Sequence, residues 1–351
     1  YGQAGFTRGQ DEAGGLPTRN FRQGHFEGID KIEGVYMAQK MKVKSETCFS
    51  CPIACKQVVQ SGAPYHVDPL YGGPEYESVG SLGSCCGIDD IEAICKANEL
   101  CNAYGLDTIE VGVTVAWAME AFEKGLLTTK ETGGVELRFG NGPALVQLVT
   151  EMGTRTGFGA WLAQGAYRCA EELGHGSLDF VVHAHKQEVP MHDPRVKNAL
   201  DLGYAISPTG ADHVNNIHDV GYQTEDGVKE LHPVGIFDPM PFTDLGPAKM
   251  RMAKHSLNWS ILWNCVGLCM CYPFDRKLTA QLIEAGAGWD ISLLEMQEIG
   301  ESEIRELEPA LNRRFKLGVF APDNGSTVDP HLLVKAIAGK VLPNENCTNP
   351  R

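Results

Sequence analysis

The fold class is decided by residues 89–125, DDIEAICKANELCNAYGLDTIEVGVTVAWAMEAFEKG. Apolar residues recur there at three- and four-residue spacing from 91 to 104, behind acidic residues that can cap a helix, and the run ends near Gly105. A second run of the same kind spans 108–124 and stops at Gly125. This spacing is typical of α-helices that bury one face, so two successive helices are predicted.

The same periodicity continues along most of the chain, with a Gly or Pro near one end of each run. Further helices are expected at about 143–152, 159–173, 195–206, 247–264, 276–285, 300–315 and 330–340. Strand signals are few, and Phe180-Val181-Val182 is the best of them. The first 45 residues are rich in Gly and polar side chains and indicate an irregular arm. The pattern predicts a mainly α-helical protein.

Length and composition set the limits of the architecture. The chain has 351 residues, 43% hydrophobic and 21% charged, which suits a globular protein of two domains. The composition shifts within 174–190, so we place one multihelical domain at 1–180 and a second at 181–351. The first would carry Glu77 and the cysteine loop described below, and the second would carry His213 and Cys269.

Charge and cysteine content exclude several classes of function. A net charge of −15 argues against nonspecific nucleic-acid binding and against docking on an anionic membrane. No apolar run reaches the roughly 20 residues that span a bilayer, and no signal peptide is visible. Twelve cysteines in a chain of this length do not make a disulfide scaffold and fit a reducing, anaerobic environment. We expect a cytoplasmic protein without nucleic-acid or membrane partners.

The strongest chemical signal is the loop that holds Cys48, Cys51 and Cys55 at C-x2-C-x3-C spacing. Three thiolates on one short loop can converge on a single centre, as in iron–sulfur proteins. Thiolates also suit zinc or copper(I), so the spacing favours a [4Fe–4S] cluster and leaves structural zinc open. A fourth ligand is expected from the distant segment 264–271, NCVGLCMC.

Seven segments of the chain follow one another in an order that resembles a known family. They are Leu16-Pro17-Thr18-Arg19-Asn20-Phe21, the Cys48/Cys51/Cys55 loop, Gly73-Pro74-Glu75-Tyr76-Glu77, the run from Ala97 to Asp107, Asp193-Pro194-Arg195, Gly210-Ala211-Asp212-His213 and Gly267-Leu268-Cys269. In this order they resemble the tungsten-dependent aldehyde:ferredoxin oxidoreductase family over nearly the whole chain. The resemblance implies the two helical C-terminal domains of that family. The native protein is then expected to have an N-terminal β-rich domain as well, which forms the base for two pyranopterins.

The resemblance also implies a reaction and its partners. Members of the family oxidise aldehydes to carboxylic acids with water at a tungsten (or molybdenum) bispyranopterin centre. Electrons leave through a [4Fe–4S] cluster to ferredoxin, and homodimers are common. The expected cluster ligands are Cys48, Cys51, Cys55 and Cys269, and Cys271 is an alternative to Cys269. Ferredoxins are commonly acidic, so a local basic patch is expected near the loop. Its candidates are Lys40, Lys42, Lys44 and Lys56.

Two motifs that bind the pterins map onto this chain through the resemblance. Their residues are Asn102, Gly105, Leu106 and Asp107 in the first motif, and Asn264, Gly267 and Leu268 in the second. Asn stands in both where the family usually has Asp, so its oxygen can accept from a pterin N–H only without charge assistance. Asp107 reads equally well as an N-cap for the following helix.

Glu77 and His213 match the acid–base residues of the family. A carboxylate with a raised pKa can take a proton during aldehyde oxidation, and a histidine can relay one near neutral pH. His183, His185 and His192 fit no standard zinc spacing and are expected at the surface or an interface. Cys85-Cys86 is expected to serve packing.

Two other functions compete with aldehyde oxidation. A relative of the same fold could reduce an aromatic acyl-thioester ring or a carboxylic acid within a larger complex. A non-enzymatic alternative has zinc at the four cysteines joining two helical lobes; Glu77, His213 and Asp107 argue against it, because a structural site does not need them.

Overall fold

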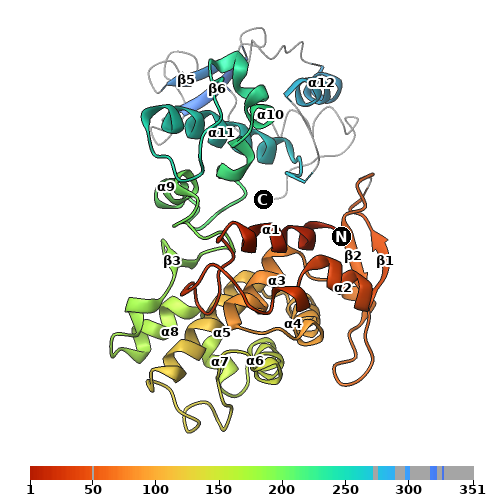
Figure 1. Ribbon diagram of the computed structural model, residues 1–351, viewed down its shortest axis with the longest axis vertical. Helices are drawn as coiled ribbons and strands as arrows, with labels where there is room; N and C mark the ends of the chain where they lie inside the picture. The colour runs from red at the N-terminus through yellow and green to blue at the C-terminus, as the bar shows by residue number, and fades with distance from the viewer. Residues whose placement is uncertain (50, 272–275, 289–296, 301–316, 322–325, 328–351) are drawn as a thin grey trace, which may run out of the picture. The chain divides into compact units, whose positions relative to one another are not determined.

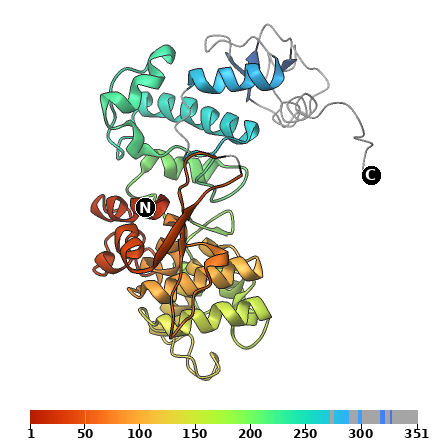
Figure 2. The same ribbon diagram turned by 90° about the vertical axis from the view of Figure 1, so that its right-hand side faces the viewer.

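The computed structural model describes residues 1–49, 51–271, 276–288, 297–300, 317–321 and 326–327. These residues form two compact units, 1–213 and 214–351, coloured in sequence from red to blue in Figures 1 and 2. Helices predominate in both. The helices expected at 300–315 and 330–340 lie outside the described residues, apart from Gly300. No helix in the described part is both long and apolar enough to cross a bilayer.

The boundary between the units differs from the one placed at residue 180. Residues 181–213 belong to the first unit, because Val189, Met191, Leu200 and Tyr204 are buried in the same apolar core as the N-terminal residues. His213 is therefore the last residue of the first unit rather than part of the second.

The first unit is built mainly from helices, with two short hairpins. Its α-helices are α1 (Thr7–Glu12), α2 (Gly34–Met41), α3 (Tyr76–Leu82), α4 (Ile91–Tyr104), α5 (Thr108–Glu123), α6 (Gly142–Thr154), α7 (Gly159–Leu162), α8 (Ala166–Leu173) and α9 (Asn198–Ile206). Its strands are β1 (Lys42–Glu46), β2 (Lys56–Val59), β3 (His183–Ala184) and β4 (Gln187–Glu188). Short 3-10 turns connect several of these elements, among them Ser84–Cys86 and Ser177–Phe180.

Helix α5 is the centre of this unit. Its residues from Val111 to Ala121 are all buried, and α3, α4, α6 and α8 pack around it. A helix that is apolar on every side is stable only when neighbours cover it, which explains why the sequence shows little amphipathic contrast there. Asp107 caps the helix, because its Oδ1 accepts from the N–H groups of Ile109 (2.8 Å) and Glu110 (3.0 Å).

The hairpin of β1 and β2 lies beside α2 and carries the cysteine loop (Figure 1). The two strands are antiparallel, and the register is irregular between Lys42 and Lys44. The sequence reading missed this hairpin, because β1 has only one apolar residue, Val43, and no apolar–polar alternation.

The second unit contains three described α-helices and a small sheet. Its helices are α10 (Glu225–Val228), α11 (Pro247–Val266) and α12 (Arg276–Ala287). Strands β5 (Gln297–Gly300), β6 (Leu317–Ala321) and β7 (Ser326–Thr327) form an antiparallel sheet in the order β5-β6-β7. A fully buried ion pair between Lys249 and Asp219 (2.7 Å) fixes the start of α11 against the preceding loop.

Three sequence-based expectations about the first unit were wrong. Residues 180–182 are not a strand, since Ser177–Phe180 is a 3-10 turn and the paired strand begins at His183. The helix expected over 159–173 is split into α7 and α8 at Gly165, whose φ is +90°. The first 45 residues are not a loose arm, because α2 and the segment between α1 and α2 bring a set of apolar side chains into the core. That set is Leu16, Phe21, Phe26, Ile32, Met37 and Met41.

Candidate functional site

Glu77 lies in the first turn of α3. Two glycines allow this helix to pack tightly against its neighbours. A Cβ on Gly112 of α5 would come within 2.5 Å of the Ser81 carbonyl carbon, so α3 and α5 touch through their backbones. A Cβ on Gly80 would meet the Met191 side chain at 2.7 Å. The segment around Met191 is thus pressed against α3, next to Glu77.

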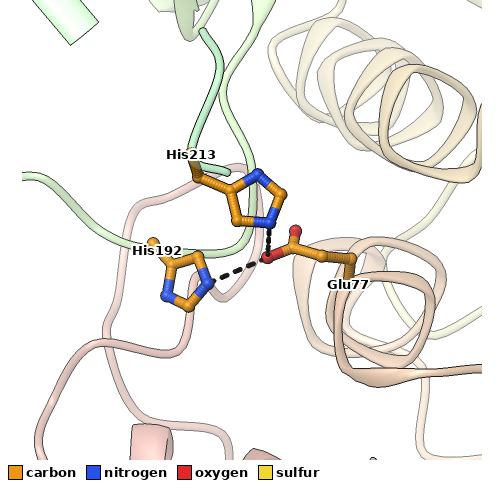
Figure 3. A group of neighbouring side chains, drawn as sticks. All are labelled: Glu77, His192 and His213. Carbon is orange, nitrogen blue, oxygen red and sulfur yellow. Dashed lines mark ion pairs between the residues drawn. The ribbon is translucent and has the colours of Figure 1, made fainter. Parts of the chain in front are cut away.

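Two histidines converge on the Glu77 carboxylate (Figure 3). Its Oε1 lies 3.0 Å from Nε2 of His192 and 3.4 Å from Nε2 of His213. The two imidazole rings lie 5.2 Å apart between centroids, and the ring of Tyr76 lies 5.1 Å from that of His192. The structure therefore brings together Glu77 and His213, the two predicted acid–base residues, and adds His192.

The two oxygens of Glu77 have different surroundings. Oε2 accepts the N–H of Met191 at 2.7 Å. Oε1 is buried and, among the described residues, makes no aligned hydrogen bond, although both Nε2 atoms are close to it. Oε1 is thus the oxygen that is left to accept a proton.

The charge state of Glu77 differs from the one expected. Burial raises the pKa of its carboxyl group, but His213, His192 and the Met191 N–H together outweigh burial and lower the pKa to about 2. Burial also lowers the pKa of His192, to about 4. At neutral pH, Glu77 is therefore a carboxylate next to a neutral His192.

His192 was expected at the surface or an interface together with two other histidines, but it is buried within the first unit. His183 and His185 are exposed, whereas His192 is 7% exposed. The available signal was its position directly before Asp193-Pro194-Arg195, a segment already singled out. Spacing alone could not reveal it, because residues 77 and 192 meet only through tertiary packing.

Two of the other recognised segments hold this site in place. Asp193 is buried, pairs with Arg195, and its N–H donates to the Gly15 carbonyl at 3.4 Å. Arg195 also donates to the Phe21 carbonyl. The N–H of Asn20 in turn donates to the Cys85 carbonyl at 2.9 Å, immediately after α3. Segments 16–21 and 193–195 therefore clamp the His192 segment onto α3.

A hydroxyl group lies near the site without a described partner. Tyr204 of α9 is 3% exposed, and its hydroxyl oxygen has no hydrogen-bond partner among the described residues. Burial, first, and then the charge of Glu77 raise its pKa well above the usual value, so it stays protonated and can donate.

The cysteine loop is open to solvent. Cys48 is exposed, Cys51 and Cys55 are half-buried, and none is in a disulfide. Tetrahedral zinc, with Zn–S bonds of about 2.3 Å, would bring its sulfurs within about 4 Å of one another. These three thiols, all within the described residues, do not form a group with ligand atoms within 4.8 Å of one another. The donor type suits an iron–sulfur cluster.

The two predicted pterin motifs have the same local structure. Gly105 follows α4 with φ +69°, and Gly267 follows α11 with φ +80°. In each, the next N–H, of Leu106 or Leu268, reaches back to a helix carbonyl at 2.8 or 2.9 Å. Glycine is favoured at such a left-handed helix end. The glycine of each motif is therefore explained by the left-handed end of the helix, independently of any ligand.

The glycines at these two helix ends are uncrowded. No atom lies within 4 Å of a Cβ placed on Gly105 or Gly267, so space is open beside both helix ends. The described hydrogen bonds of Asn102 and Asn264 use the amide nitrogen, to Tyr71 O (3.4 Å) and to Asn215 Oδ1 (2.6 Å). The amide oxygen remains as an acceptor suited to a pterin N–H.

The second motif lines a cavity within the second unit. The cavity measures about 310 Å³, and Asn264 and Leu268 line it together with Tyr222, Trp259 and Trp263. The two tryptophan rings lie 5.3 Å apart between centroids. Aromatic side chains beside polar groups suit a flat heterocycle or an aromatic ligand.

Cys269 and Cys271 belong to the second unit, close to each other, with the N–H of Cys271 3.4 Å from Sγ of Cys269. Whether either joins the cluster loop stays a prediction. Cys85 and Cys86 are fully buried in the core of the first unit, where burial raises the pKa of both thiols. Their surroundings agree with a packing role.

Comparisons with known proteins place this arrangement in a family. The family model described as aldehyde ferredoxin oxidoreductase, domains 2 & 3, matches residues 1–333. The tungsten-containing aldehyde ferredoxin oxidoreductase of Thermococcus kodakarensis is 34% identical over 307 residues, which is 86% of this chain and 48% of the relative. The chain thus spans about half the length of the curated relatives it matches.

More distant relatives have other activities. The WOR-like subunit of an aliphatic sulfonate oxidoreductase from Pyrococcus furiosus is 28% identical over 221 residues, covering 61% of this chain and 35% of that protein. A solved structure, the BamBC active-site complex of benzoyl coenzyme A reductase with 1,5-dienoyl-CoA, shares the fold. Its TM-score is 0.59 at 17% identity, over 82% of this chain and 48% of that one. With its two helical units and ordered motifs, the chain belongs to the aldehyde ferredoxin oxidoreductase family and corresponds to its domains 2 and 3.

Proposed function

We propose that the complete protein oxidises aldehydes to carboxylic acids, with water as the oxygen source and ferredoxin as the electron acceptor. Family membership and the tungsten-containing relatives support this reaction class. The observation that carries it is the buried Glu77 carboxylate, whose Oε1 faces two imidazole nitrogens and has no aligned hydrogen bond among the described residues.

The reaction converts an aldehyde and water into a carboxylic acid, two protons and two electrons. When bound, the tungsten (or molybdenum) bispyranopterin supplies a Lewis acid and a two-electron acceptor, and the [4Fe–4S] cluster passes the electrons on singly. Cys48, Cys51, Cys55 and Cys269 would hold the cluster. The pterins would be held by Asn102, Gly105, Leu106 and Asp107 at one helix end, and by Asn264, Gly267 and Leu268 at the other.

The residues of this chain manage the protons. Glu77 is ionised at neutral pH, so its Oε1 can accept a proton from water, although its low pKa makes it a weak base when it acts alone. His213, 3.4 Å away, can take that proton on and pass it outward, or hydrogen-bond the substrate oxygen. We therefore assign Glu77 and His213 to one proton-transfer unit.

The test is Glu77→Gln, which keeps the shape of the side chain and removes its charge. We expect aldehyde oxidation to fall by about 10²- to 10⁴-fold, the usual effect of losing a general acid–base group. Tungsten and iron contents should be unchanged. Glu75→Gln is the matched control: it removes a half-buried carboxylate two residues away that is not among the groups in contact with His192 or His213. Full turnover in Glu77→Gln would remove Glu77 from the mechanism.

A second candidate function is the reduction of an aromatic acyl-thioester ring or a carboxylic acid in a larger complex. The aromatic lining of the cavity in the second unit, Tyr222, Trp259 and Trp263, favours it. A flavin or additional iron–sulfur subunits that co-purify with the native protein would support this candidate. Aldehyde oxidation by the isolated protein, without such subunits, would count against it.

Elemental analysis of the full-length native protein, purified without oxygen, tests the cofactors. About four iron atoms and one tungsten or molybdenum per chain are expected. Stoichiometric zinc without iron or tungsten would instead favour a zinc-bearing structural protein.

A further inference from the structure

Lys197 is a charged residue with no place in the proposed reaction, yet it lies directly behind the site. Its side chain is completely buried. Its Nζ lies 2.6 Å from Nδ1 of His192 and 2.7 Å from Oε1 of Gln10. Lysine is almost never fully buried unless its ammonium group has partners, so these contacts need a reason.

The chemistry of this contact decides which ring nitrogen of His192 carries its proton. A lysine ammonium group has three N–H donors and no lone pair. Nδ1 of His192, 2.6 Å away, must then accept and is unprotonated. The single proton of the neutral ring is left on Nε2, the atom that lies 3.0 Å from Oε1 of Glu77.

We propose that Lys197 is a positioning residue: by donating to Nδ1 of His192, it fixes the ring in the Nε2–H form that faces Glu77. The same contact keeps Glu77, His192 and His213 from acting as a divalent-metal site. The positioning role in turnover rests on the proposed role of Glu77. The proton position and the exclusion of metal do not.

The exclusion of metal matters because the three residues otherwise resemble a metal site. Their ligand atoms all lie within 4.8 Å of one another. Two histidines and one carboxylate are the ligand set of non-haem iron(II) sites. A ligating histidine, however, binds through an unprotonated nitrogen and usually donates its other N–H to a carboxylate, carbonyl or water. His192 has the reverse arrangement, with a donor on Nδ1 and the proton on Nε2.

The charge state of the ring agrees with this arrangement. Burial lowers the pKa of His192 to about 4, and the neighbouring Lys197 acts in the same direction. The ring of His192 is neutral at pH 7 and carries a single N–H proton. Lys197 determines which of the two ring nitrogens holds this proton.

The first experiment uses the unmodified full-length protein, so it does not depend on how a variant folds. Nitrogen NMR of histidine-labelled protein distinguishes the two neutral tautomers, and the signal of His192 is assigned by its loss in His192→Gln. We expect the Nε2–H form. A signal from the Nδ1–H form would overturn the proposal, whether or not the protein oxidises aldehydes.

The second experiment measures cobalt(II) uptake by the cofactor-loaded protein, using the visible absorption of the bound ion. The unmodified protein should take up no cobalt at the three residues. Lys197→Met frees Nδ1 to be protonated and Nε2 to bind, so this variant should gain about one cobalt, and the double variant Lys197→Met/His192→Gln should lose it. Uptake by the unmodified protein that His192→Gln abolishes would overturn the proposal, as would no gain in a folded Lys197→Met.

Kinetics complete the test. We expect kcat in Lys197→Met to fall about 10- to 100-fold, the range for residues that orient a functional histidine, with little change in KM. Lys197→Arg, which keeps donors without a lone pair, should recover part of the loss. Lys96→Met, which removes a lysine from α4, is the control and should retain full kcat.

An unchanged kcat in folded Lys197→Met would overturn the positioning role. If Glu77→Gln is also fully active, the proposed function fails instead, while the NMR and cobalt results still decide the proton position.

Discussion

Two roles are considered for Asp107, the cap of α5 and the proposed binding of a pterin. Its two carboxylate oxygens allow these roles to be separated. Oδ1 caps α5 through the N–H groups of Ile109 and Glu110. A role in pterin binding would use the second oxygen and the charge. The cap needs only an acceptor oxygen, which asparagine also offers, whereas a charge-assisted bond needs the carboxylate.

We therefore expect Asp107→Ala to lower the free energy of unfolding by about 1 kcal/mol, the usual value of a lost N-cap. Asp107→Asn should keep most of that stability. Denaturant unfolding and tungsten content are measured side by side for both variants. A fall in tungsten in Asp107→Asn, with stability retained, would show that the charge serves the cofactor. Equal tungsten in Asp107→Asn and the unmodified protein would leave the cap as its only role.

Single residues were predictable from the sequence where a motif marked them. Glu77 and His213 were each singled out by a motif, and the structure brings them together although they lie far apart in the sequence. His192 and Lys197 were not found, because their importance comes from contacts across the fold. A buried lysine donating to a histidine leaves no periodic or spacing signal in the sequence.

At the scale of elements, the approach of α3 to α5 sets the position of Glu77. The contact depends on Gly112, where even a methyl group would lie 2.5 Å from backbone carbon of Ser81. Backbone cannot rotate away as a side chain can, so α3 itself would have to move. In an unobstructed helix the same change to alanine would gain up to about 1 kcal/mol.

We predict that Gly112→Ala is destabilising by about 1–3 kcal/mol, the usual cost of overpacking a core. Gly9→Ala in α1 is the matched control, because no atom lies within 4 Å of the new methyl group. It should be neutral or stabilising. Thermal unfolding of the two variants decides the matter: a Gly112→Ala protein as stable as the control would show that α3 is not held by this contact.

The long helices were predicted closely and the short elements were not. α4, α5, α6 and α11 are each 13 or more residues long, with Gly at or near several ends, and α4 and α6 also have a clear apolar face. The β1–β2 hairpin and the 3-10 turn at Ser177–Phe180 are short, and their conformation is set by neighbours rather than by local pattern. This is the physical reason why the unit containing the site was recognised while its cysteine-bearing hairpin was missed.

At the scale of the whole molecule, the proposed electron acceptor would have to bind an acidic chain. The net charge of −15 would repel an acidic carrier, so attraction has to be local. Of the lysines near the cysteine loop, Lys40 pairs with Glu92 (2.9 Å) and Lys44 with Glu46 (2.5 Å). Among the described residues, Lys42 and Lys56 have no such ion pair. Lys42 begins β1, and Lys56 begins β2 directly after the cysteine loop.

We expect charge reversal at Lys42 and Lys44 to slow electron transfer to ferredoxin without changing metal content, because a charged patch acts mainly on the association rate. The effect should weaken as salt is added. Lys56→Glu should act in the same direction, and more strongly than Lys44→Glu, since Glu46 already offsets the charge of Lys44. Stopped-flow reduction of ferredoxin measures it. Unaltered rates at low salt would remove the basic patch from the proposal.

The clamp formed by segments 16–21 and 193–195 has a consequence for motion. Arg19, Asn20 and Phe21 have φ values of 47°, 54° and 60°, a conformation that L-residues hold only when their surroundings compel it. The backbone that follows α3 is joined to this segment by two hydrogen bonds, from the Arg19 N–H to the Ser84 carbonyl (3.0 Å) and from the Asn20 N–H to the Cys85 carbonyl (2.9 Å). Local opening of the site would have to release both of them at once. We therefore expect the segment around Glu77 to be among the slower-opening parts of its unit, so the mobility that the proposed turnover requires would come from elsewhere in the protein.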